Sequence, residues 1–179
     1  MPSIRPHSPS RDDAVDAVDI LNDLYNDFFS ASALWRSLMR HKAEGRLGFQ
    51  QHILDRVVMS HISIALFKVD ELFGHPKYCA LFGNLEIDER RKVRKEIAEK
   101  NLRTLRSGYL GHILSDDLGR PLRTSEMERL RERVMGDDMN NFVSWVADGE
   151  RPVMLLLRRM RDHIQKQYGI DPQKEILDR

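Results

Sequence analysis

Apolar side chains recur every three or four residues along most of the chain, which is the spacing of one face of an α-helix. In the first such segment this face carries Ala14, Val18, Leu21, Tyr25 and Phe28. The alternation of β-branched and polar residues that marks a strand is nearly absent. The pattern therefore predicts an all-α protein without a sheet.

Capping signals predict where the helices begin and end. Ser10 and Asp13 form a capping box that opens the first helix, which we expect to continue to Gly45. The most apolar segment, residues 48–73, is predicted to be a central helix buried on two sides and broken at Gly74.

The second half of the chain gives further helix signals. Asp88 is a plausible N-cap for a basic helix that runs toward His112, and Ser125 with Glu128 resembles a second capping box. A last long helix is expected to end at Gly169.

The length of 179 residues fits one domain with a real core. The first ten residues contain three prolines and three serines, so residues 1–10 are predicted to be a disordered lead-in. We expect a single helical domain over 11–170 and a C-terminal tail over 171–179.

Composition adds few constraints on function. The chain is 41% hydrophobic and 32% charged, with a net charge of +1, so any basic site must be local. The single cysteine, Cys79, excludes an internal disulfide. No apolar stretch approaches the length of a membrane span, and the N-terminus has no apolar signal segment. We therefore expect a cytoplasmic protein with no membrane partner.

One face of the first helix is acidic. An acidic stripe of this kind is typical of a solvated helix face, and the alternative functions are binding of a metal or of a basic partner. The stripe consists of Asp12, Asp16, Asp19, Asp23 and Asp27.

The common metal and nucleotide motifs are missing. The seven histidines include no pair three or four residues apart, so no pair shares a helix face at metal-ligand spacing. No Gly-rich phosphate loop, GxSxG elbow or HExxH motif is present. The sequence accordingly predicts neither a metal nor a cofactor.

A basic run ends in a candidate catalytic pair. Most such runs are solvated helix faces, but Arg103 and Arg106 share a face and lead toward His112. On a continued helix His112 would lie about 9 Å further along the axis than Arg106. The run consists of Arg90, Arg91, Lys92, Arg94, Lys95, Lys100, Arg103 and Arg106.

An arginine and a histidine are suited to cutting RNA without a metal. Arginine offers a planar fork of donors to a phosphate and stays charged throughout the reaction. Histidine transfers protons near neutral pH, here from a 2′-hydroxyl or to a leaving 5′-oxygen.

The segment "LRSGYLGHI" resembles the motif of the HEPN superfamily (higher eukaryotes and prokaryotes nucleotide-binding). This motif has an Arg, a polar residue and, four to six residues after the Arg, a His; Arg106, Ser107 and His112 match it. The segment "ISIALFKVDELFG" is similar to a helix of abortive-infection-type members, with Asp70 at the position of their Asp.

This resemblance implies a dimeric four- to five-helix bundle with metal-independent endoribonuclease activity of toxin or phage-defence type. Arg106 and His112 would be catalytic at the dimer cleft, with Arg103, Ser107 and Tyr109 binding the RNA substrate. An antitoxin protein would be a further partner, and no cofactor is implied.

Two alternatives remain open at this point. The chain is a catalytically inactive HEPN-like bundle that binds RNA, a nucleotide or a protein, or it is an unrelated helical bundle. In the unrelated bundle, Arg106 would cap local carbonyl groups.

Overall fold

The computed structural model describes residues 9–46, 51–100, 102, 123–135 and 138–171. Within these ranges every regular element is a helix, and no strand occurs among them, so the predicted all-α fold is confirmed. The helices are α1 (Arg11–Ala43), α2 (Gln51–Gly74), α3 (Pro76–Phe82), α4 (Ile87–Glu99), α6 (Thr124–Met135), α7 (Met139–Ala147) and α8 (Val153–Tyr168).

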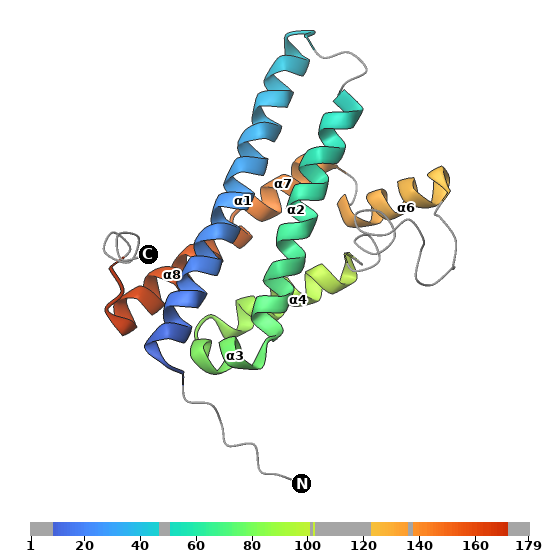
Figure 1. Ribbon diagram of the computed structural model, residues 1–179. Coiled ribbons are helices and arrows are strands. Elements are labelled where there is room, and N and C mark those ends of the chain that lie inside the picture. Colours follow the sequence, from blue (N-terminus) through green and yellow to red (C-terminus); the bar gives the residue numbers. More distant parts are fainter. Residues whose placement is uncertain (1–8, 47–50, 101, 103–122, 136–137, 172–179) are drawn as a thin grey trace.

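The helix α1 organises the bundle. It packs lengthwise beside α2, and α7 and α8 also pack against it (Figure 1). The short helix α3 contacts the lower ends of both α1 and α2, while α4 packs on α2 and α8. Helices from both halves of the sequence therefore share one core.

The buried face of α1 follows the predicted apolar spacing. Leu21 and Phe28 are fully buried there, and they belong to one cluster with Leu66 of α2, Phe142 of α7 and Met160 of α8. The same cluster extends over all seven described helices. Removal of this apolar surface from water is the main force that holds the helices together.

Several predicted helix ends are confirmed. At the start of α1, the Asp13 N–H donates to Ser10 Oγ at 3.1 Å and the Ser10 N–H donates to Asp13 Oδ2 at 2.9 Å. Gly169 ends α8 with a left-handed φ of 62°, which glycine adopts without steric cost. The first helix runs unbroken to Ala43.

The predicted N-cap at Asp88 is wrong. Helix α4 begins at Ile87, because the Arg90 N–H donates to the carbonyl of Glu86, which occupies the cap position at a φ of 49°. Asp88 instead lies in the first turn, where a negative charge still interacts favourably with the helix dipole.

The predicted capping box of Ser125 and Glu128 is wrong by two residues. Helix α6 begins at Thr124, so Ser125 already lies inside it. The backbone N–H of Arg123 donates to Glu126 Oε2 at 2.7 Å, which is the carboxylate half of a capping box.

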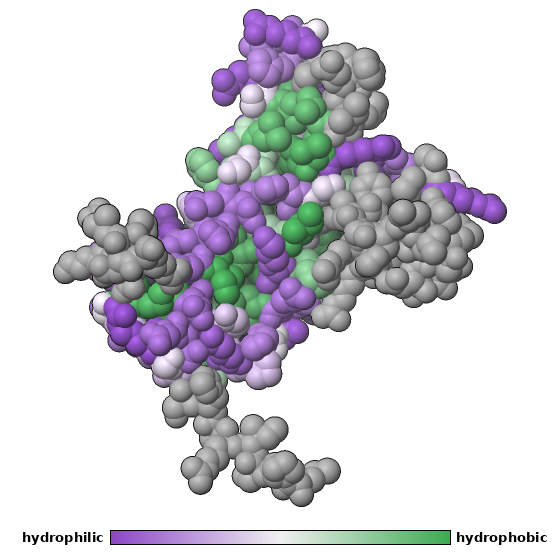
Figure 2. Space-filling model, viewed as in Figure 1, coloured by the Kyte–Doolittle hydropathy of each residue, from purple (hydrophilic) through white to green (hydrophobic). Residues whose placement is uncertain are grey.

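Much of the predicted lead-in and tail, 1–8 and 172–179, lies outside the described residues. Among the helices that are described, none is long and apolar enough for a membrane span. Hydrophilic side chains cover much of the surface in Figure 2, with hydrophobic patches along the α1–α2 pair. Among the side chains of these two helices whose exposure is described, the large apolar ones that are exposed are Phe29, Leu34, Val57 and Ile64.

Phe28 and Phe29 provide a matched test of this packing. Phe28 is 0% exposed and Phe29 is 55% exposed. We expect Phe28→Ala to lower the free energy of unfolding by about 3–5 kcal/mol, because it leaves a cavity in the core. Phe29→Ala should change it by no more than about 0.5 kcal/mol. Chemical denaturation followed by circular dichroism checks both; equal effects would contradict the burial of α1 described here.

Candidate functional site

The site residues predicted from the motif lie outside the described part of the chain. These residues are Arg103, Arg106, Ser107, Tyr109 and His112. The described structure reaches the edge of this segment, where α4 ends at Glu99 and Leu102 is buried. The candidate site that the structure defines is therefore built from other residues.

Three basic residues of α4 pair with acidic residues of their own helix. Each pair joins positions three or four apart on an exposed face, which is how a solvated charge run behaves. The pairs are Arg91 with Asp88, Lys92 with Glu96 and Lys95 with Glu99.

Arg90 has a structural role. The residue is 7% exposed, and its side chain donates from Nη2 to the Gly83 carbonyl at 2.6 Å and from Nε to the Leu85 carbonyl at 2.8 Å. Burial lowers the pKa of this guanidinium. Arg90 thus fixes the turn between α3 and α4.

Lys100 is held at the end of α4 in a similar way. Its Nζ donates to the Val134 carbonyl at 3.0 Å and lies 5.4 Å from the Phe142 ring centroid and 5.3 Å from that of Trp145. Burial lowers the pKa of this amine. Lys100 satisfies a carbonyl in the last turn of α6 and connects α4 to α6 and α7.

Arg94 differs from its neighbours because it faces another helix and remains accessible. Its Nε is 2.9 Å from Asp70 Oδ1 on α2, and its side chain is 43% exposed whereas that of Asp70 is 10% exposed. The guanidinium lies over Gly74, where an added Cβ would be 2.9 Å from Nη2. The Nη groups make no hydrogen bond to any other described residue, so they are available to a ligand.

An open pocket of about 680 Å³ lies beside Arg94. It is formed where α1, α2, α3 and α4 meet, and its lining includes Ile20, Lys68, Asp70, His75, Tyr78 and Arg94. Glu71 also lines it and is exposed, whereas the buried Asp70 carboxylate is paired with Arg94. Lys68 is exposed and lies 3.5 Å from Asp27.

His75 and Tyr78 give the pocket an aromatic side. Their ring centroids are 5.4 Å apart. His75 is the N-cap of α3, and its Nδ1 accepts a hydrogen bond from the Lys77 N–H at 3.3 Å. Both rings therefore lie at the start of α3, His75 as its N-cap directly after Gly74 and Tyr78 in its first turn.

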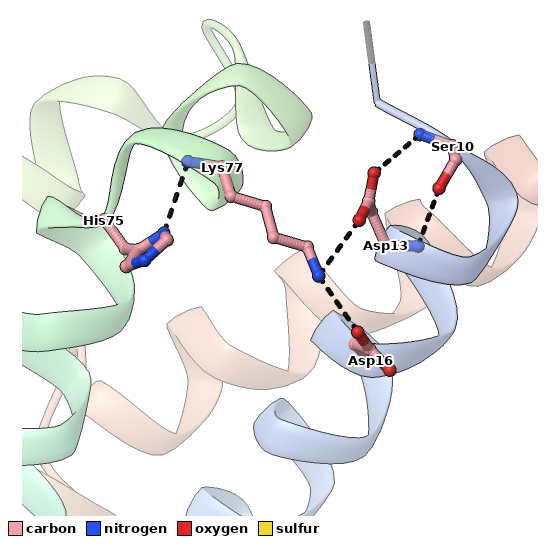
Figure 3. Close-up of polar contacts among 5 residues, drawn as sticks. All are labelled: Ser10, Asp13, Asp16, His75 and Lys77. Carbon is pink, nitrogen blue, oxygen red and sulfur yellow. Dashed lines mark hydrogen bonds and ion pairs between the residues drawn. The ribbon is translucent and has the colours of Figure 1, made fainter. Parts of the chain in front are cut away.

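The side chain of Lys77 fastens α3 to α1 (Figure 3). Its Nζ is 2.9 Å from Asp13 Oδ1 and 3.0 Å from Asp16 Oδ2. These two carboxylates raise the pKa of the Lys77 amine. The ion pairs hold the His75–Tyr78 turn in place relative to α1.

The acidic face of α1 contacts basic residues of this same chain. Asp16 pairs with Lys77, and Asp27 pairs with Lys68 and with His61 at 3.4 Å. Among the described residues no group of three His, Cys, Asp or Glu side chains is placed to hold a metal ion. In the described structure this face therefore binds α2 and α3.

The arrangement is suited to binding an anion that carries an apolar or aromatic group. Arginine binds phosphate and carboxylate through parallel N–H donors, and aromatic rings stack on planar groups. Sequence reasoning singled out Asp70 but not its partner Arg94, nor His75 as a lining residue. A buried Asp within the most apolar helix was the available signal, because such a group requires a partner.

Comparison with known proteins supports the fold. No protein-family model matches the chain, and no curated protein matches it. Among solved structures, the chain is similar to the integron cassette protein Vpc_cass2 from the mobile metagenome of V. paracholerae. The TM-score is 0.70 at 20% sequence identity, and the match covers 86% of this chain and 96% of that chain. A likeness at this identity establishes the fold alone.

Gly74→Ala tests whether the glycine places Arg94. The new methyl group would occupy the space next to Nη2, and the flexible guanidinium can move away. We expect the Arg94 Nε–H resonance to shift in a ¹⁵N–¹H spectrum. The free energy of unfolding should stay equal or rise by up to about 1 kcal/mol, because alanine favours helix more than glycine does. An unchanged Arg94 resonance would contradict the close approach.

Proposed function

We propose that this protein is a HEPN-like helical module that binds a nucleotide phosphate, either of a free nucleotide or of an RNA chain. The observation that carries the proposal is Arg94, an accessible arginine held by a buried carboxylate at the edge of a pocket with an aromatic side. The catalytically inactive HEPN-like alternative also predicts binding of RNA or a nucleotide, which agrees with this chemistry.

The ion pair with Asp70 orients Arg94 before any ligand arrives. Arginine has five N–H donors, and the Asp70 contact uses the one on Nε. The remaining donors can bind two phosphate oxygens, and the pocket lining also includes Lys68, which pairs with Asp27. A preorganised donor loses less conformational entropy on binding than a mobile one.

The aromatic side of the pocket favours a nucleotide over inorganic phosphate as the ligand. Tyr78 lines the pocket beside His75, and stacking of a base on an aromatic side chain contributes about 1–3 kcal/mol. A volume of about 680 Å³ lies within the range of small-molecule and cofactor pockets.

Arg94→Gln tests the binding proposal. We expect affinity for a mononucleotide or a short RNA to fall about 10- to 100-fold, since a charge-assisted hydrogen bond contributes about 1.5–3 kcal/mol. Isothermal titration calorimetry with AMP, GMP and a single-stranded RNA hexamer separates free nucleotide from RNA chain as the source of the phosphate.

Two variants serve as controls for this experiment. Arg91→Gln removes an equal charge from an exposed position of the same helix and should leave affinity nearly unchanged. Arg94→Lys keeps the charge opposite Asp70 but loses the planar fork, so it should remain folded and bind weakly. Equal binding by wild type and Arg94→Gln would overturn the proposal.

The second candidate function is metal-independent cleavage of RNA by Arg106 and His112. The Arg–polar–His motif favours this function, with Arg103, Ser107 and Tyr109 contacting the RNA. In this proposal the active form is a homodimer of toxin or phage-defence type, with an antitoxin protein as partner.

RNA cleavage in EDTA tests the second candidate. We expect wild-type protein to cut single-stranded RNA with EDTA present, and both Arg106→Ala and His112→Ala to reduce the rate at least about 100-fold, the scale of lost acid–base catalysis. Gel analysis of labelled RNA gives the rates, and circular dichroism checks folding. Intact RNA with wild type would rule out this function and leave the binding proposal unaffected.

A further inference from the structure

We infer that His75 donates a hydrogen bond from Nε2 to the phosphate bound at Arg94, and that the pocket therefore prefers a phosphate monoester to a phosphodiester. This inference rests on the proposed nucleotide binding. It narrows the ligand to a nucleotide or RNA end with a terminal phosphate.

The capping bond fixes which nitrogen of His75 carries the proton. Nδ1 accepts a hydrogen bond from the Lys77 N–H at 3.3 Å, so it must present a lone pair. A neutral imidazole has one N–H, which is then on Nε2. A bond made by one ring nitrogen sets the role of the other in this way in many binding sites.

The position of the ring is also fixed. His75 has the extended backbone of an N-cap (φ −73°, ψ 127°), and Pro76 follows it at the first position of α3. Lys77 connects the same turn to Asp13 and Asp16 of α1 (Figure 3). The Nε2 donor makes no hydrogen bond to another described residue, and the ring lines the pocket.

Gly74 is next to both His75 and the Arg94 guanidinium. The guanidinium lies over Gly74, with Nη2 2.9 Å from the place of an added Cβ, and His75 is the next residue in the chain. Both side chains line the same pocket. A phosphate bound at Arg94 is thereby brought to the side of the pocket that carries His75.

The donors of Arg94 and His75 together determine whether the pocket prefers a phosphate monoester or a phosphodiester. A monoester has three terminal oxygens, of which a guanidinium fork binds two, so the third can accept from a neutral N–H donor. In a diester this third position is an ester oxygen that carries a substituent, which is a weaker acceptor than a terminal oxygen, so the His75 donor has a poorer partner in the complex. A poorer hydrogen bond lowers affinity, which makes the site selective.

A pair of ligands with the same base tests this inference. The probes are AMP and its phosphate methyl ester, in which one terminal oxygen is blocked. We expect wild type to bind AMP about tenfold more tightly, the effect of one hydrogen bond of about 1.4 kcal/mol. His75→Asn keeps an N-cap side chain and should lose the part of this preference that the hydrogen bond contributes, which leaves only the effect of the extra negative charge of AMP.

The control and a second measurement make the outcomes distinguishable. His61→Asn removes an exposed histidine of α2 that pairs with Asp27, and it should retain the preference for AMP. In wild type, long-range ¹⁵N–¹H spectra should show an unprotonated Nδ1 and a protonated Nε2 for His75.

Each negative result has a separate meaning. If wild type binds neither probe nor RNA, the proposed function fails. If wild type binds both probes equally, if His75→Asn keeps the full preference, or if His75 is protonated on Nδ1, only the role of His75 is overturned.

Discussion

The packing of α1 against α2 on one side and α8 on the other is the constraint on which the rest of the structure depends. Helix α1 is 33 residues long, which corresponds to about 50 Å. Its apolar stripe enters a core shared with all the other described helices. The same helix also builds the pocket, because Asp13 and Asp16 hold Lys77 and Ile20 lines the cavity. Stability and the candidate site therefore rest on the same helix.

The elements of this fold were predictable from the sequence because their signals are local. Apolar spacing and caps such as Ser10 and Gly169 involve residues within one or two helical turns. The start of α4 was mispredicted because it depends on Arg90, whose buried side chain holds the carbonyls of the preceding turn. A contact of this kind, between a side chain and a turn, cannot be inferred from the periodicity of apolar residues in the sequence.

The candidate site was less predictable for a related reason. Arg90, Arg94 and Lys100 look alike within one basic run, yet they respectively hold a turn, face a pocket and connect helices. These roles differ only because each basic side chain contacts different groups in the folded protein. Asp70 was singled out only by the resemblance of its segment to a helix of abortive-infection-type HEPN proteins, and its partner lies 24 residues away. Periodicity shows which face is buried and does not show what lies against it.

The Asp70–Arg94 pair fixes the orientation of Arg94 more than it stabilises the fold. A buried ion pair contributes little net stability, because both charges lose water when they meet. Here the loss is uneven, since the carboxylate side chain is 10% exposed and the guanidinium 43% exposed. The buried acid holds the arginine in one orientation while the donors at its tip remain in contact with the pocket. Gly74 provides the space for that orientation, and His75, the N-cap of α3, directly follows it. The likeness to Vpc_cass2 concerns the scaffold, whereas function must be argued from side chains such as these.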